Sequence, residues 1–167
     1  DLRLLKIVPW QNKSEMKKTK STKINLREAL KEASAAAQAA GKLMRQNFRS
    51  AKVVNDALRY DIKLELDVRC QALTEKMLLK TFPQTAVFGE EGVSGDQSAE
   101  YRWVIDPIDG TVNFAHDIPH ACVSIAFQKR IDSDSPFPHE HYETLVGVIY
   151  DPFVDEIFTA IKDRRRG

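Results

Sequence analysis

One stretch of this sequence decides the fold, and it reads Trp103-Val104-Ile105-Asp106-Pro107-Ile108-Asp109-Gly110-Thr111-Val112-Asn113-Phe114. Its apolar beginning is typical of a β-strand that delivers Asp106 at its end. Pro107 then fixes the backbone, and Gly110 permits a tight turn. Asp106 and Asp109 therefore leave one rigid corner, where their carboxylates can converge on one point.

Another acidic pair lies upstream in Gly89-Glu90-Glu91-Gly92, directly after a short apolar run. This segment can bring a further carboxylate to the same edge as Asp106. Two carboxylates about 4 Å apart repel by about 4 kcal/mol at an effective dielectric constant near 20, so such a cluster needs a cation. Carboxylate oxygens suit Mg²⁺, Mn²⁺ or Ca²⁺, whereas the scarcity of cysteine and of suitably spaced histidine argues against zinc. The same acidic residues are also common as caps and turn formers, and composition alone leaves both interpretations open.

Two helices are predicted before this region. Asn25 followed by Glu28 resembles a capping box, and apolar residues recur every three or four positions over residues 25–48. A second helix is predicted over residues 67–81, where Pro83 ends it. Its predicted buried stripe consists of Leu66, Cys70, Leu73 and Met77. Asp67 then lies at the start of the second helix.

Short runs rich in β-branched and aromatic residues follow and predict strands. They lie near residues 86–88, 102–105, 122–128, 144–150 and 156–161. The turn 151–155 joins the last two strands as an antiparallel hairpin, and residues 131–143 form a polar surface loop. This order predicts an α+β fold in layers, with two N-terminal helices packed on a largely antiparallel sheet.

Size and composition exclude several classes of protein. At 167 residues, 43% of them hydrophobic, the chain is long enough to form one domain with its own core. Its apolar runs fall far short of the roughly 20 residues that cross a bilayer, so no membrane association is expected. With 25 basic and 24 acidic residues, the net charge of +1 offers no strong field for nucleic acid.

The cysteines and the N-terminus suggest where the domain begins and what surrounds it. Cys70 and Cys122 match neither a disulfide framework nor a Cys-x-x-Cys motif, so a reducing, cytoplasmic setting is expected. Residues 1–24 carry seven Lys or Arg and two acidic residues, and they lack the pattern of a secretory signal. We therefore expect a mobile basic extension over residues 1–24 and a folded domain over residues 25–167.

The central stretch closely resembles the signature of the inositol monophosphatase family. The resemblance runs through residues 106–114, Pro119 and residues 123–126, and Gly89-Glu90-Glu91 stands where the family has Gly-Glu-Glu. Residues 61–67 stand where the family has an Asp-x-x-Thr-x-x-Asp segment. The resemblance covers roughly residues 25–162. It implies the first half of an αβαβα sandwich and a Mg²⁺-dependent phosphatase acting on a small-molecule phosphate ester, such as an inositol monophosphate.

Carried over to this sequence, the resemblance also implies site residues. Glu90, Asp106 and the backbone carbonyl of Ile108 would hold a first Mg²⁺, and Asp106 and Asp109 would share a second. Thr111 and Asp67 would position and activate the attacking water. The amides of Gly110 and Thr111, at the start of a helix, would bind the substrate phosphate.

Two departures from the family pattern bear on these roles. Leu64 stands where the family has threonine, which affects the register and the hydrogen bonding near Asp67. The sequence also stops where family members continue into a second α/β portion with another metal-binding aspartate. We therefore expect weak or no activity from this chain alone. We also expect association through an uncovered sheet into a homodimer or a larger homo-oligomer, or dependence on a partner that supplies the missing half.

Two rival functions stay open. A phosphatase of the haloacid dehalogenase type also places Asp-x-Asp-Gly-Thr after an apolar strand, but its two aspartates are two residues apart, whereas Asp106 and Asp109 are three apart. The other alternative is a half-length, non-catalytic relative that acts as a partner or a fold fragment.

Other residues that could do chemistry have plainer interpretations. His139 and His141 are expected to be a solvated pair, and His116 and His120 to be surface turn residues. Cys122 is expected to be a buried, inert thiol, and the arginine run 164–166 a solvated tail.

Overall fold

The computed structural model of this chain describes residues 24–50, 54–58, 61–132, 134, 136 and 141–162. The predicted basic extension up to Lys23, His139 and the arginine run 164–166 lie outside the described residues. Ile24, which the sequence prediction assigned to the extension, packs against the core.

The first helix, α1 (Leu26–Asn47), begins where its cap predicted. The Asn25 side chain accepts hydrogen bonds from the N–H groups of Arg27 at 3.0 Å and Glu28 at 3.4 Å, which satisfies donors that the helix itself cannot pair. The buried face consists mainly of small residues, namely Ala29, Ala33, Ala36, Ala37, Ala40, Gly41 and Met44. Because these side chains are short, α1 can lie close to the layer beneath it.

The close approach of α1 is tightest at Gly41. A Cβ atom at this position would lie 2.5 Å from the ring of Tyr150 and 3.0 Å from Pro152. This contact explains why a glycine stands in the middle of a helix, where it costs about 1 kcal/mol relative to alanine.

The second helix, α2 (Glu65–Thr81), begins two residues earlier than predicted, with Leu64 as its N-cap. Asp67 is the third residue of the helix, and its carboxylate accepts a 3.0 Å hydrogen bond from the Leu64 N–H. The buried residues are Leu66, Asp67, Cys70, Gln71, Thr74 and Leu78. Of the predicted stripe, Leu66 and Cys70 are buried, and Met77 is half-buried and packs against the core. Leu73 is also only half-buried, because polar side chains take part of the buried face.

Six strands form the main sheet in the order β4-β3-β5-β6-β7-β8. They are β3 (Ala86–Gly89), β4 (Gly92–Ser94), β5 (Tyr101–Asp109), β6 (Cys122–Arg130), β7 (Tyr142–Asp151) and β8 (Glu156–Ile161). Strands β3 and β5 run parallel, and the other neighbouring pairs run antiparallel. All five predicted strands are present, including the predicted β7–β8 hairpin. The short strand β4 was not predicted.

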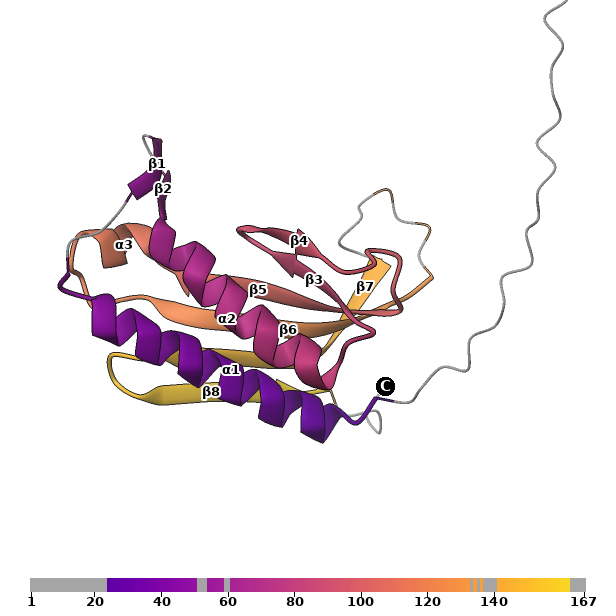
Figure 1. The fold of residues 1–167 in the computed structure, drawn as a ribbon. Helices are drawn as coiled ribbons and strands as arrows, with labels where there is room; N and C mark the ends of the chain where they lie inside the picture. The colour runs from indigo at the N-terminus through magenta and orange to yellow at the C-terminus, as the bar shows by residue number, and fades with distance from the viewer. Residues whose placement is uncertain are drawn as a thin grey trace, which may run out of the picture.

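A separate hairpin was also missed. It consists of β1 (Val54–Leu58) and β2 (Asp61–Leu64), which pair antiparallel with an irregularity near Asp56. In Figure 1 this hairpin projects beyond the start of α2. Its strands are too short, and too mixed in polarity, to give a strand pattern in the sequence.

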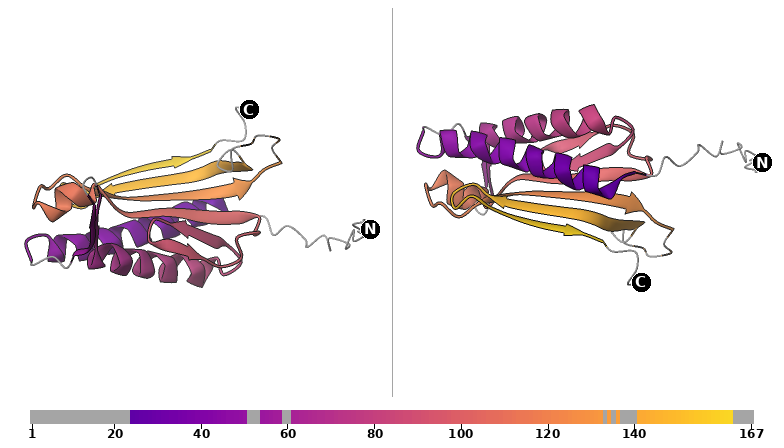
Figure 2. Two further views of the ribbon diagram at one scale, coloured as in Figure 1. Left: turned by 90° about the horizontal axis from the view of Figure 1, so that it is seen from above. Right: turned by 90° about the horizontal axis from the view of Figure 1, so that it is seen from below.

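The helices and the main sheet form two layers, with α1 and α2 on the same face of the sheet (Figures 1 and 2). Helix α1 lies across β6 and β7, and α2 lies across β5. Alternate residues of the central strands point into the core, where Trp103, Ile105, Val123, Ile125 and Phe127 are at most 2% exposed. This is the predicted α+β layered fold, and its two layers agree with the first half of an αβαβα sandwich.

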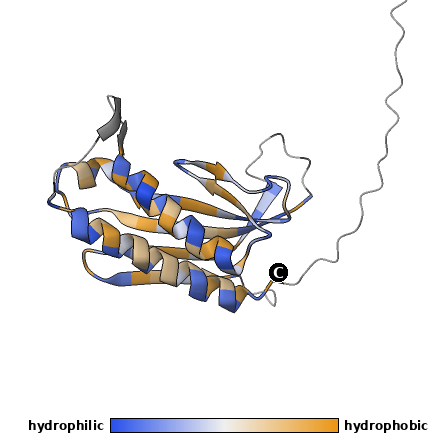
Figure 3. Cartoon of the chain, in the orientation of Figure 1, coloured by the Kyte–Doolittle hydropathy of each residue, from blue (hydrophilic) through white to orange (hydrophobic). Residues whose placement is uncertain are grey.

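Strand β8 forms one edge of the sheet, and all six of its residues are exposed. The exposed apolar side chains include Phe158, at 58%, and Ile149 of β7, at 46%. In Figure 3 apolar and polar residues are interspersed along the strands. None of the described helices is long and apolar enough to cross a membrane.

Candidate active site

Strand β5 includes both Asp106 and Asp109. The predicted strand ends near residue 105, so that predicted boundary is too early. Asp106 pairs with Ser124 and Asp109 with Cys122 of β6, so three steps along β5 match two along β6. In a regular strand, residues three apart point to opposite faces. The extra residue is a β-bulge that turns both carboxylates to the face opposite the helices.

Glu90 lies beside this bulge because β3 runs parallel to β5. The Glu90 N–H donates a 3.1 Å hydrogen bond to the Ile105 carbonyl, so Glu90 is held next to the residue that precedes Asp106. Glu91, the other acidic residue of the pair, is half-buried. The predicted approach of the Gly89-Glu90-Glu91 segment to Asp106 is therefore present in the structure.

Asp106 has the most unusual environment in this group. Its Oδ1 atom is buried and has no hydrogen-bond partner. Burial, the neighbouring Glu90 carboxylate and the charge of Asp109 together hold the pKa of Asp106 well above its ordinary value of 3.8. Because an unpaired buried oxygen beside like charges is unfavourable, these groups fit a hard cation such as Mg²⁺.

No group of three or more His, Cys, Asp or Glu side chains within the described part of the chain is close enough to hold a metal ion. Ile108, the predicted carbonyl ligand, has a fully buried side chain, and its carbonyl accepts a 2.8 Å hydrogen bond from the Thr111 hydroxyl. The side chain of Asp61 lies outside the described residues. The fit to a cation therefore rests on the unpaired oxygen of Asp106 and the acidic groups that act on it.

Thr111 and Asp67 are also brought together, although they are 44 residues apart in the sequence. The Thr111 Oγ1 lies 3.2 Å from Asp67 Oδ1, and its single proton can be donated either to Asp67 or to the Ile108 carbonyl. Burial raises the pKa of Asp67 to about 6, although hydrogen bonds from Leu64 and Thr111 act in the opposite direction. A hydroxyl and a carboxyl group thus meet where α2 begins.

Gly110 connects β5 to the short helix α3 (Thr111–Ala115). Its φ of +98° is left-handed, and a Cβ atom would lie 2.9 Å from the His120 carbonyl oxygen. Glycine is therefore required at this turn. Since α3 has only five residues, its dipole contributes little, and any anion binding here would depend on individual N–H groups.

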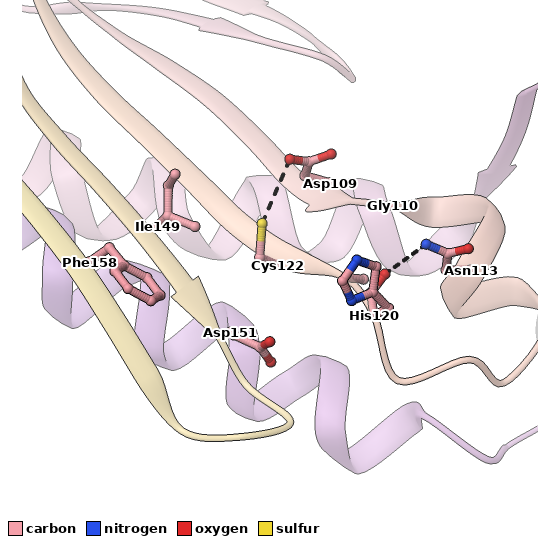
Figure 4. Close-up of a pocket in the computed structure, with 9 residues that line it drawn as sticks. Asp109, Gly110, Asn113, His120, Cys122, Ile149, Asp151 and Phe158 are labelled. Atoms are coloured by element: carbon pink, nitrogen blue, oxygen red, sulfur yellow. Dashed lines mark hydrogen bonds between the residues drawn. The ribbon is translucent and has the colours of Figure 1, made fainter.

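A pocket of about 430 Å³ opens beside Asp109. Figure 4 shows Asp109, Cys122, Asp151 and His120 around one end, with Ile149 and Phe158 toward the other. The Cys122 Sγ lies 3.7 Å from Asp109 Oδ2. Cys122 is thus half-buried at the pocket rather than fully buried as predicted. Its partial burial and the Asp109 charge raise the pKa of the thiol to about 11 and keep it protonated.

The sequence interpretation did not single out Asp151 or Asn113, which also line this pocket. The Asn113 side chain donates a 2.9 Å hydrogen bond to the His120 carbonyl, while Asp151 accepts from the Phe153 N–H at 2.8 Å. In the sequence, Asp151 follows an apolar run and directly precedes a proline, as does Asp106. That shared pattern was the signal that could have identified it. His120 is exposed, as expected, and also lines the pocket.

The fold and the candidate site together define the class of the protein, which is a two-layer α+β domain. Its acidic residues gather where Asp106 and Asp109 lie on the bulge of β5, Glu90 follows β3 and Asp67 lies at the start of α2. Within that class the family is clear. The sequence profile of the inositol monophosphatase family matches residues 25–166, and the chain belongs to this family.

Individual relatives agree with this assignment. The chain is 35% identical over 144 residues to inositol monophosphatase 1 of Solanum lycopersicum, which covers 84% of this chain and 49% of the relative. It is 37% identical over 136 residues to Nus factor SuhB of Pseudomonas aeruginosa, covering 77% of this chain and 45% of that protein.

Solved structures show the same fold. The inositol monophosphatase of Anabaena has 34% identity and a TM-score of 0.63, with 83% of this chain and 45% of that chain covered. The extragenic suppressor protein SuhB of Bartonella henselae has 27% identity and a TM-score of 0.70, with 81% and 49% covered. The chain spans about half the length of the relatives it matches.

Proposed function

We propose that this chain forms the Mg²⁺-binding part of a phosphomonoesterase that hydrolyses a small phosphorylated alcohol, such as an inositol monophosphate. The observation that carries the proposal is the buried, unpaired Oδ1 of Asp106 beside the acidic side chains of Glu90 and Asp109. Membership of the inositol monophosphatase family supports phosphatase chemistry.

Four residues would hold the cations. Glu90, Asp106 and the Ile108 carbonyl are assigned to one Mg²⁺, and Asp106 and Asp109 to a second. Bound Mg²⁺ would neutralise the phosphate, activate a water molecule for attack and stabilise the leaving oxygen. The bulge in β5 supports the shared role of Asp106, because it turns both carboxylates to one face.

The chain's own groups would then orient the reactants. Thr111 and Asp67, which contact each other at 3.2 Å, would hold the attacking water, with the Asp67 carboxylate accepting its proton. The N–H groups of Gly110 and Thr111 would bind the phosphate. In this mechanism water attacks phosphorus directly, and no residue is phosphorylated.

The two rival functions lead to different observations. An aspartyl-phosphate trapped on Asp106 would indicate the haloacid dehalogenase type of chemistry. A purified chain that releases no phosphate, with or without Mg²⁺, would indicate a non-catalytic relative. Neither rival is favoured by the family assignment.

The direct test is phosphate release from inositol 1-phosphate by the purified chain, with and without Mg²⁺. Because the relatives are about twice as long, we expect Mg²⁺-dependent release at less than roughly 1 per second, below the ordinary range of enzymes. Asp106→Asn should abolish that release. Release that needs no Mg²⁺, or that survives Asp106→Asn unchanged, would contradict the proposal.

We also propose that the chain acts in the cytoplasm, because the positions of its two cysteines match neither a disulfide framework nor a Cys-x-x-Cys motif.

We further propose that the chain self-associates through β8. This edge strand is exposed along its whole length, and edge strands readily pair with another strand. Antiparallel pairing of two β8 strands would bring the acidic end at Glu156 near the basic end at Lys162 of the second copy. Light scattering should therefore show a dimer or a larger assembly, and Phe158→Lys should shift it toward monomer. A stable wild-type monomer would contradict this proposal.

A further inference from the structure

The side chain of Gln71 joins α2 to the turn that carries Glu90. Gln71 is only 6% exposed and lies one helical turn after Asp67. Its Oε1 accepts a 2.9 Å hydrogen bond from the Glu91 N–H, and its Nε2 donates a 3.1 Å hydrogen bond to the Gly92 carbonyl. The two bonds hold the backbone immediately after Glu90.

The Glu90 backbone is held from the other side by β5. Its own N–H donates to the Ile105 carbonyl at 3.1 Å, whereas its side chain is exposed and gains little from packing. Apart from its contact with the Asp106 carboxyl group, the direction of the Glu90 carboxylate therefore depends on backbone bonds on both sides of the residue. Gln71 supplies two of them.

Gly89 is matched to this arrangement. A Cβ atom at position 89 would lie well inside van der Waals contact with the amide group of Gln71. The absence of a side chain at Gly89 is thus what admits the Gln71 amide to the turn. Glu75 lies one helical turn after Gln71 on α2, and its carboxylate contacts the hydroxyl of Ser94 on β4. Helix α2 therefore also holds β4.

The amide side chain of Gln71 satisfies both backbone groups. The side chain must accept a hydrogen bond from the Glu91 N–H and donate one to the Gly92 carbonyl. A carboxylate at position 71 could accept the first bond but could not donate the second. A hydrophobic side chain of similar length would leave both backbone groups without this partner.

We propose that Gln71 is a positioning residue that fixes the Glu90 turn, so that the Glu90 carboxylate faces Asp106 in a geometry suited to a divalent cation. This inference rests on the proposed function, since it concerns the same cation site. Groups that orient metal ligands typically change metal affinity by about 10- to 100-fold when they are removed.

The test compares the full chain with Gln71→Met, which keeps the length of the side chain and removes both hydrogen bonds. Two quantities are measured: the Mg²⁺ dissociation constant by calorimetry, and hydrogen exchange of the Glu91 amide in metal-free protein by NMR. We expect the dissociation constant to rise about tenfold. We also expect the Glu91 amide to exchange about fivefold faster or more, as the loss of one hydrogen bond predicts.

Thr74→Val is the matched control. Thr74 is fully buried on the same face of α2, but its hydroxyl bonds to the Cys70 carbonyl within the helix and not to the turn. This variant should leave both the Mg²⁺ affinity and Glu91 exchange unchanged. If Gln71→Met proves unfolded by circular dichroism, Gly89→Ala gives the same test from the other side, because its methyl group would displace the Gln71 amide.

The outcomes separate the two claims. A folded variant with wild-type Mg²⁺ affinity overturns the positioning role, whether or not Glu91 exchange is faster. A wild-type chain that binds no Mg²⁺ overturns the proposed function and this inference with it. Weaker Mg²⁺ binding together with faster Glu91 exchange, both absent from Thr74→Val, supports the inference.

Discussion

Helices α1 and α2 cover the same face of one sheet, yet they bury different kinds of residues. The buried face of α1 is almost entirely alanine, whereas that of α2 includes Asp67, Gln71 and Thr74. Polar groups are costly to bury unless they find partners, and these three do: Asp67 contacts Thr111, Gln71 bonds to the Glu90 turn, and Thr74 bonds within the helix. The difference teaches that α1 mainly packs the two layers together, while α2 also contacts the residues of the candidate site.

The largest expected effect comes from breaking α1. Ala37 is fully buried, so Ala37→Asp places an unpaired charge between the layers and should destabilise the fold by more than about 3 kcal/mol. Ala35 is exposed on the same helix, and Ala35→Asp should cost less than about 1 kcal/mol. Urea denaturation followed by circular dichroism measures both values. Equal losses would mean that α1 does not carry the packing assigned to it.

Breaking the contact between α2 and α3 should affect function rather than folding. We expect Asp67→Asn and Thr111→Ala each to lower the kcat of Mg²⁺-dependent phosphate release about a hundredfold, with KM nearly unchanged, because both act on the attacking water. As the two side chains touch, the double variant should lose little more than the more damaging single variant. Steady-state kinetics on the full chain decides this, and a change in KM alone would show that the water-positioning roles are wrong.

The smallest effect sharpens the comparison at Gly41. Replacing a glycine by alanine in a helix usually stabilises it by about 1 kcal/mol. Here the new methyl group would meet Tyr150, so we expect Gly41→Ala to destabilise the fold by about 1 kcal/mol instead. Ala35→Gly measures the ordinary propensity at an exposed position of the same helix. A higher melting temperature for Gly41→Ala would show that α1 does not lie so close to β7.

The two helices also show what the sequence could predict. The Asn25 cap and the apolar spacing located α1 almost to the residue, because its buried face is apolar and follows the helical period. The same reasoning placed Leu73 and Met77 in the stripe of α2, since buried polar residues such as Gln71 count as surface residues in a hydropathy pattern. The available signal was that Gln71 lies four positions, or about one helical turn, after Asp67 and therefore on the same face of α2.

The site was predicted in part. The spacing of Asp106 and Asp109 indicated convergence, but the cause is a bulge within β5, which depends on the pairing with β6 and is not visible in the sequence. The contact of Thr111 with Asp67 followed from the family resemblance alone, because residues so far apart in the chain carry no local pattern. The roles assigned to all these residues stay predictions.

Mg²⁺ binding by Asp106→Asn, compared with the wild-type chain, tests the central claim most directly. The substitution keeps the size of the side chain and removes the charge that both proposed cations share. Asp96→Asn is the matched control, because it removes the same charge from an exposed turn, where the Asp96 carboxylate accepts hydrogen bonds from the N–H and the hydroxyl of Ser98. Calorimetric titration should show an Mg²⁺ dissociation constant at least about tenfold higher for Asp106→Asn, and unchanged for Asp96→Asn. Identical titration curves for the wild type and Asp106→Asn would contradict the assignment of this site.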